Sequence, residues 1–179
     1  MEAGRERRTN AEVAAELAPR GCEESPVPSG ASLRPSDVRA RVLAEHRELS
    51  AQLERVEALA RATLQGELAT IRELRAECIE MVAWLRDHFR LEERILVPVL
   101  RDLGPRGAES VQRFIGEHER QRAIIAALYR SASTPTASSL ELALLAWGFV
   151  RLLRLDMRAE EKLYLGERLL RDAASSAAP

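Results

Sequence analysis

The chain contains 179 residues, which is enough for one domain with a hydrophobic core of its own. Its 27 basic and 28 acidic residues give a net charge of −1, which excludes the strongly basic surface that binds nucleic acid or an anionic membrane. Hydrophobic residues make up 46% of the sequence, but aromatic residues only 4%. Because most of the non-aromatic hydrophobic residues are Leu, Ala and Val, the composition favours helices over sheets.

No segment of the sequence has the pattern of an export signal or a membrane anchor. The longest apolar run, at residues 142–150, is too short to span a bilayer. The first ten residues are charged and lack the apolar stretch of a secretory signal. The two cysteines, Cys22 and Cys78, are too few for a disulfide framework. These features predict a cytoplasmic protein in a reducing compartment.

The first 34 residues differ from the rest of the chain. They contain several prolines and glycines and show no steady apolar period, which predicts a disordered tail with at most a short helix near residues 11–17. Ordered structure is expected to begin at Ser36 as an N-cap, with Asp37 in the first turn. We therefore predict an N-terminal tail, a helical domain and a C-terminal tail, at residues 1–34, 35–173 and 174–179.

The predicted domain shows four helical segments, at about residues 37–63, 67–103, 108–130 and 139–172. In each segment apolar residues recur at spacings of three and four, which is the period of one helix face. Gly66 and the pair Gly104-Pro105 predict the first two boundaries, and Ser138 with Glu141 forms a capping box before the last helix. Since the connections are short and no strand pattern occurs, the sequence predicts an all-α, up-down-up-down four-helix bundle.

Polar side chains interrupt the apolar stripe of every helix. The three histidines of the chain, His46, His88 and His118, each lie on the core-facing stripe of one of the first three helices. Glu92 follows His88 by four residues, and this spacing places both side chains on one face, a turn apart.

The stripe of the fourth helix has no histidine but carries Asp156 and Glu160, again four residues apart. Counted at 1.5 Å per residue, the polar residues of all four helices fall at a similar depth in the bundle. Burying several carboxylates costs free energy unless a positive charge accompanies them, and no Lys or Arg lies on these stripes. Nitrogen and oxygen ligands suit one or two first-row metal ions, so we predict a metal site at His46, His88, Glu92, His118, Asp156 and Glu160, with Glu92 and Glu160 as the bridging pair.

Each of these residues also has an interpretation that needs no metal. A single histidine on an apolar face is more often a hydrogen-bonded core residue than a ligand, and only the combination favours ligation. Glu93 and Glu161 point about 100° away from the stripe, so we expect them in solvent or as hydrogen-bond partners of ligands. Cys78, Trp84 and Tyr164 are interpreted as core residues, the last two alternatively as residues that shape the metal pocket.

The sequence resembles the hemerythrin-like HHE cation-binding domain over about residues 36–172. The resemblance rests on His88-Phe89-Arg90-Leu91-Glu92-Glu93 with Leu96 and Pro98, on His46 and His118, and on Asp156-Met157-Arg158-Ala159-Glu160-Glu161. It implies a four-helix bundle that holds two non-haem iron ions, bridged by carboxylates, at His46, His88, Glu92, His118 and Glu160. It also implies a small diatomic ligand, oxygen or nitric oxide, without choosing among oxygen carriage, sensing, and protection of iron–sulfur centres.

One position departs from the family pattern. The fourth motif of the family is usually His-x-x-x-Glu, whereas here it begins with Asp156. We predict that Asp156 is a ligand, because its place on the stripe aims it at the cavity that the histidines face. The alternative is that Asp156 hydrogen-bonds to a bound water or to a ligand histidine.

Three functions are compatible with such a site. The preferred one is a protein that binds or senses oxygen, nitric oxide, or the iron and redox state of the cell. The second is an enzyme that uses the same irons for oxidation or peroxide removal, which requires a substrate pocket beside them. The third is a metal-free bundle that serves as an interaction module. No nucleic-acid or membrane partner is expected, and no protein partner is identified.

Overall fold

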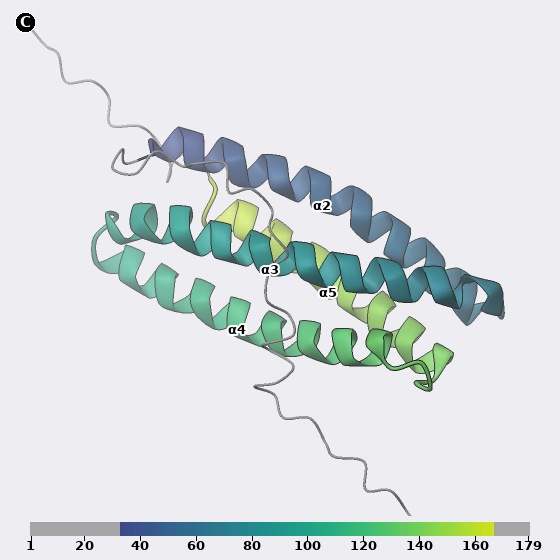
Figure 1. Ribbon diagram of the computed structural model, residues 1–179. Coiled ribbons are helices and arrows are strands. Elements are labelled where there is room, and N and C mark those ends of the chain that lie inside the picture. Colours follow the sequence, from purple (N-terminus) through teal and green to yellow (C-terminus); the bar gives the residue numbers. More distant parts are fainter. Residues whose placement is uncertain (1–32, 167–179) are drawn as a thin grey trace, which may run out of the picture. The chain divides into compact units, whose positions relative to one another are not determined.

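The structure is a computed structural model, and it describes residues 33–166. Four long helices form this part of the chain (Figure 1). They run side by side, and each turns back at its end into the next, which confirms the predicted all-α four-helix bundle. A short 3-10 helix, η1, precedes the second one. The elements are α2 (Pro35–Leu64), η1 (Leu68–Thr70), α3 (Ile71–Arg101), α4 (Pro105–Ser133) and α5 (Ser139–Leu163).

Two apolar clusters fill the core of the bundle. Helix α2 packs mainly on α5 and α3, and α3 packs mainly on α4. The larger cluster occupies one half of the bundle and includes Leu49, Leu85, Ile125 and Met157. The smaller cluster occupies the other half and includes Val42, Ile95, Phe114 and Tyr164. The larger cluster draws side chains from all four helices, and the smaller one from α2, α3, α4 and the residues that follow α5, so the bundle is held together at both levels.

The helix boundaries follow from local chemistry, with differences from the predicted ones. Gly66 and Gly104 have positive φ angles of 96° and 76° and separate the helices, as predicted. Ser138 caps α5 by accepting a hydrogen bond from the Glu141 backbone N–H at 3.4 Å. The expected N-cap at Ser36 is wrong. Because Pro35 begins the helix, Arg34 is the N-cap residue, and its side chain makes no cap hydrogen bond. Similarly, α4 begins at Pro105, three residues earlier than predicted.

Helix α5 ends at Leu163, earlier than the predicted residue 172. The backbone N–H groups of Tyr164 and Leu165 both donate to the carbonyl of Glu160, which closes the last turn. Tyr164 and Leu165 are buried in the smaller cluster, and Arg39 of α2 donates to the Leu165 carbonyl at 2.8 Å. These contacts draw the chain onto the bundle at the end of α5. The short helix expected near residues 11–17, residues 1–32 of the predicted N-terminal tail and the predicted C-terminal tail lie outside the described residues.

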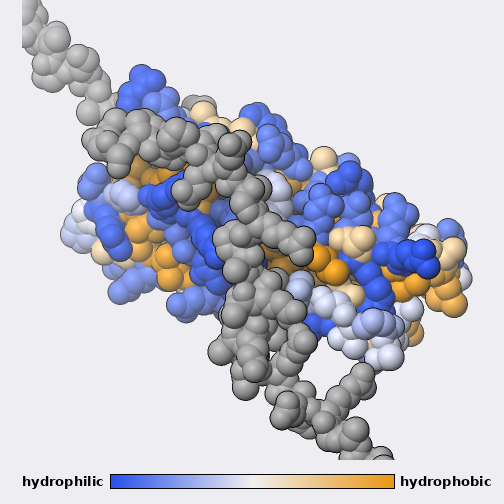
Figure 2. Space-filling model, viewed as in Figure 1, coloured by the Kyte–Doolittle hydropathy of each residue, from blue (hydrophilic) through white to orange (hydrophobic). Residues whose placement is uncertain are grey.

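Among the coloured atoms of Figure 2, polar side chains predominate, and apolar side chains show between them. Within residues 33–166, no helix is both long enough and apolar enough to cross a membrane.

Candidate metal centre

A layer of polar side chains lies between the two apolar clusters. On α2, His46 falls between Val42 of the smaller cluster and Leu49 of the larger one. On α4, His118 falls in the same way between Phe114 and Ile125. At the same level, α3 carries His88 and Glu92, and α5 carries Glu160. All five side chains are buried: His46, His88, Glu92, His118 and Glu160.

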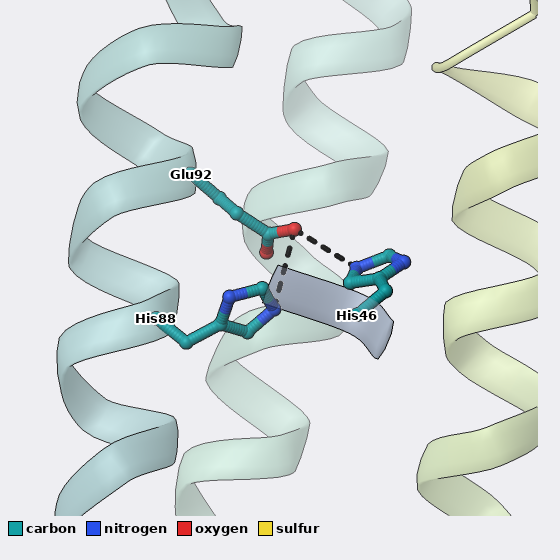
Figure 3. A group of neighbouring side chains, drawn as sticks. All are labelled: His46, His88 and Glu92. Atoms are coloured by element: carbon teal, nitrogen blue, oxygen red, sulfur yellow. Dashed lines mark hydrogen bonds and ion pairs between the residues drawn. The ribbon is translucent and has the colours of Figure 1, made fainter. Parts of the chain in front are cut away.

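Glu92 lies at the middle of this layer with only 1% of its surface exposed. Its Oε1 atom is 3.2 Å from Nε2 of His46 and 3.3 Å from Nε2 of His88, so one carboxylate oxygen reaches between two imidazoles (Figure 3). The three side chains come from two helices, α2 and α3, and their polar atoms converge. Their donor atoms all lie within 4.8 Å of one another, which is close enough to hold one metal ion.

The second oxygen of Glu92 faces a second group of potential ligands. Oε2 of Glu92 lies 3.3 Å from Nε2 of His118, and Oε1 of Glu160 lies 3.6 Å from the same nitrogen. Donor atoms of Glu92, His118 and Glu160 again lie within 4.8 Å of one another. The other oxygen of Glu160, Oε2, is 3.5 Å from Nε2 of His46. The two groups therefore share Glu92, and Glu160 also reaches from one to the other.

Two atoms at the centre of the layer lack hydrogen-bond partners. Oε2 of Glu92 and Nε2 of His118 are both buried and lie 3.3 Å apart, but among the described residues neither atom makes a hydrogen bond. A buried polar atom without a partner costs about 1–3 kcal/mol, so such atoms are rare unless a water or an ion satisfies them. The two atoms are a carboxylate oxygen and an imidazole nitrogen, which are typical ligands of a first-row metal ion. The residues present therefore fit a metal centre.

The Nδ1 atom of each imidazole, on the side of the ring away from Glu92, hydrogen-bonds to a second carboxylate. His46 donates from Nδ1 to Glu161 at 3.0 Å. His88 donates from Nδ1 to Glu45 at 3.0 Å, and His118 donates from Nδ1 to Glu93 at 2.8 Å. A proton fixed on Nδ1 leaves Nε2 as the nitrogen that faces the centre. This arrangement of carboxylate, histidine and metal orients the ring and raises the basicity of the ligand nitrogen.

Two of the three outer carboxylates also contact an arginine. Arg122 donates to Oε1 of Glu93 at 2.6 Å, and Arg41 donates to Oε1 of Glu45 at 3.1 Å. Glu161 is the most exposed of the three, with 42% of its side-chain surface accessible. The carboxylate that hydrogen-bonds to His46 is therefore the most exposed of the three, whereas the carboxylates that hydrogen-bond to His88 and His118 each pair with an arginine.

Sequence reasoning placed Glu93 and Glu161 in solvent or beside the ligands, and the structure selects the second alternative. It missed Glu45, which adjoins His46 in sequence but contacts His88 of the neighbouring helix. A signal was available, because each of these acids directly precedes or follows a predicted ligand. Which histidine an outer acid reaches depends on how the helices are set against each other.

Without a metal, protons on His46 and His118 offset buried negative charge in the layer. Burial lowers the pKa of His46, but hydrogen bonds with Glu160, Glu92 and Glu161 outweigh this effect and raise it to about 10. Burial also lowers the pKa of His118, and the nearby carboxylates of Glu160, Glu92 and Glu93 outweigh this effect and raise it to about 9. Burial raises the pKa of Glu92, and its contacts with His118 and His46 outweigh this and lower the pKa to about 2. The metal-free site thus holds a carboxylate between imidazolium ions, and a metal ion must displace these protons.

Asp156 is the one predicted ligand that the structure does not bring into either group of potential ligands. Its Oδ2 atom accepts a hydrogen bond from Nε2 of Gln121 at 3.0 Å, and the carboxylate is only partly buried. Burial, with a further contribution from Glu160, raises the pKa of Asp156 above its usual value. The ligation of a metal by Asp156 stays a prediction.

Aromatic rings pack against the imidazoles on several sides. Trp84 stacks on His88 with 5.1 Å between ring centroids, and Phe89 stacks on His118 at 4.4 Å. Tyr164 is buried in the smaller cluster and contacts the ring of Phe114. Trp84 therefore packs beside the centre, whereas Tyr164 serves the core next to it. Cys78 is a buried core residue, and burial raises the pKa of its thiol to about 12.

Comparison with protein families identifies the class of this chain. The family model of the hemerythrin HHE cation-binding domain matches residues 37–167, which is more than half of the sequence. The chain therefore belongs to the hemerythrin HHE cation-binding family, as its motifs suggested. Comparisons with curated proteins and with solved structures gave no significant match.

Proposed function

We propose that this protein binds two non-haem iron ions in the core of the bundle and, through them, a small diatomic ligand, oxygen or nitric oxide. Membership of a cation-binding family and the two groups of His and Glu donors support metal binding. Two adjacent groups that share one carboxylate suit a pair of ions better than a single ion. Glu92 is the first bridging residue in this proposal, and Glu160 is the second.

The observation that carries the proposal is the orientation of the three imidazoles. In each of them Nδ1 is bound to an outer carboxylate while Nε2 faces Glu92 or Glu160. A histidine that served only packing would not need a carboxylate behind it and a second carboxylate in front. A set of imidazole nitrogens and carboxylate oxygens without any thiolate suits iron or a similar first-row metal ion.

In this proposal the protein residues hold and insulate the ions. His46, His88 and His118 bind through Nε2, and the outer carboxylates keep their rings in place. The two apolar clusters above and below the layer exclude water from the centre. Iron supplies the reversible coordination of a diatomic ligand and the one-electron chemistry that the side chains lack.

Metal analysis of the full chain, purified from iron-replete cells, tests the proposal. We expect close to two equivalents of iron and, in the oxidised protein, charge-transfer absorption that azide or nitric oxide changes. The Glu92→Gln variant should lose most of the metal, whereas Glu119→Gln, a matched change at an exposed position of α4, should keep it. A parent protein that stays metal-free under these conditions would rule the proposal out.

Thermal unfolding gives a second readout of the same proposal. A ligand that binds only the folded state stabilises it by about 2.7 kcal/mol when its free concentration is 100 times its Kd. Metal-loaded protein should therefore melt at a higher temperature than metal-free protein. Equal melting curves for the two forms would show that no specific site is filled.

A further inference from the structure

We propose that Gln121 holds Asp156 away from the metal centre, so that one coordination position on the His118 side stays open for a small ligand. This inference rests on the proposed pair of metal ions and concerns which of the two accepts the ligand. It assigns a positioning role to Gln121, a residue that none of the family motifs in the sequence includes.

The donors are distributed unequally between the two sides of the centre. On one side, Nε2 of His46 lies near both Oε1 of Glu92 and Oε2 of Glu160, and His88 adds a second imidazole. On the other side, Nε2 of His118 lies near the remaining oxygens of the two glutamates. If both glutamates bridge the two ions, four potential ligand atoms of the protein surround the first metal position, and three surround the second. The side with fewer donors has more room for a ligand from outside the protein.

The polar pair Gln121 and Asp156 lies one helical turn from the ligands of this second position. Gln121 follows His118 by three residues on α4, and Asp156 precedes Glu160 by four on α5. Only 3% of the Gln121 surface is exposed. Its Nε2 atom donates to Oδ2 of Asp156 at 3.0 Å, and its Oε1 atom makes no hydrogen bond within residues 33–166.

The hydrogen bond gives a physical reason for Asp156 to stay where it is. If Asp156 turned away toward the metal, the buried Gln121 amide would lose its acceptor, and such a loss costs about 1–3 kcal/mol. Glu160 also repels Asp156, and this repulsion contributes to the raised pKa of Asp156. Gln121 therefore acts as a latch on Asp156, and the latch keeps a carboxylate out of the open position.

Asp156 is partly exposed beside the buried Gln121, so this side of the layer is within reach of solvent.

Azide binding to the oxidised, iron-loaded full chain tests the inference, with Gln121→Leu as the key variant. Removing the amide frees Asp156 to bind the second ion and fill the open position. We expect the azide affinity of this variant to fall by about tenfold or more and the reduction potential to decrease, because another anionic ligand favours the oxidised state. Gln121→Leu combined with Asp156→Asn should restore azide binding toward the parent value.

A matched control is available in Gln52, a buried glutamine of α2 that is 8% exposed. Gln52→Leu should leave azide affinity and reduction potential unchanged. A Gln121→Leu variant that holds two irons and binds azide like the parent would overturn this inference alone. So would a double variant that binds azide no better than Gln121→Leu. A parent protein that takes up no metal would instead overturn the proposed function and this inference with it.

Discussion

Nδ1 of His118 lies 2.8 Å from Oε1 of Glu93, and the same oxygen accepts a hydrogen bond from Arg122. His118 is completely buried, whereas Arg122 is partly exposed, so the chain of contacts leads from the centre to the surface of α4. Glu93 is the link, because it orients the imidazole and receives the charge of the arginine. Its removal is therefore expected to affect the metal more than the fold.

We expect Glu93→Gln to weaken metal binding by about 10–100-fold, the usual cost of losing a carboxylate that supports a metal-bound histidine. The amide keeps the size of the side chain but loses its charge. Metal affinity measured by competition with a chelator checks this, with Glu119→Gln, the same change at an exposed position of α4, as the control. Unchanged affinity in Glu93→Gln would mean that Glu93 does not support a metal ligand.

Metal uptake should release protons from the site. At pH 7 the metal-free protein carries protons on both ring nitrogens of His46 and His118, whose pKa values are about 10 and about 9. A metal bound at Nε2 must displace one proton from each ring, so affinity should rise with pH across the neutral range. Calorimetry in buffers of different ionisation enthalpy measures the number released. Uptake with no proton release would contradict the assignment of these two nitrogens as ligands.

The stability of the metal-free protein should depend on pH in two directions. The pKa of His46 is raised from 6.5 to about 10, so its stabilising contribution is complete below pH 6.5 and is lost as the pH rises toward 10. The pKa of Glu92 is lowered from 4.5 to about 2, so its contribution is complete above pH 4.5 and is lost as the pH falls toward 2.

Urea unfolding of the metal-free protein at a series of pH values should therefore show greatest stability between about pH 4.5 and 6.5. Glu92→Gln should flatten the profile on the alkaline side, because the imidazoles lose the carboxylate that raises their pKa. If the stability of the metal-free protein does not change between pH 6.5 and 10, the buried imidazoles are neutral and their assigned protonation is wrong.

The fold and five members of the centre follow from the sequence because both depend on one helix at a time. Spacings of three and four identify the buried face, and His46, His88, Glu92, His118 and Glu160 stand on it. Contacts that depend on the register between helices are not encoded in this way. Glu45 reaches His88 rather than the ring next to it, and Gln121 reaches Asp156 across α4 and α5.

The end of the last helix was mispredicted for a related reason. The periodic pattern continues past Leu163, and helix propensity alone would extend α5. The structure instead buries Tyr164 and Leu165, and the Leu165 carbonyl accepts a hydrogen bond from Arg39 of α2. Tertiary packing overrides local propensity there, and Gly166, just after the turn, was the available sequence signal.

Removing residues 1–30 should leave metal content and melting temperature unchanged. All the side chains of the proposed centre and both apolar clusters lie within residues 33–166, and the truncated chain keeps Leu33, which packs on the smaller cluster. Iron stoichiometry and thermal unfolding of the truncated and full chains check this. Lost metal or aggregation after truncation would show that the removed segment packs on the bundle.

Replacing Asp156 by alanine distinguishes the predicted ligation from the latch. If Asp156 binds a metal, Asp156→Ala should lose part of the iron. If Gln121 holds it away, the variant should keep two irons and bind azide at least as tightly as the parent, because a negative charge has been removed from beside the open position.

Asp156→His should convert the open position into a filled one. The longer imidazole extends further from α5 than the carboxylate, and it restores the His-x-x-x-Glu spacing ahead of Glu160. The substitution removes a negative charge from beside the centre and adds a neutral nitrogen ligand, so the reduction potential should rise while the iron stoichiometry stays the same. Azide affinity should fall because the new ligand competes for the same position. Asp156→Asn is the control, since it removes the charge without adding a ligand of comparable strength. If Asp156→His keeps the spectrum, reduction potential and azide affinity of the parent, position 156 does not face the metal centre.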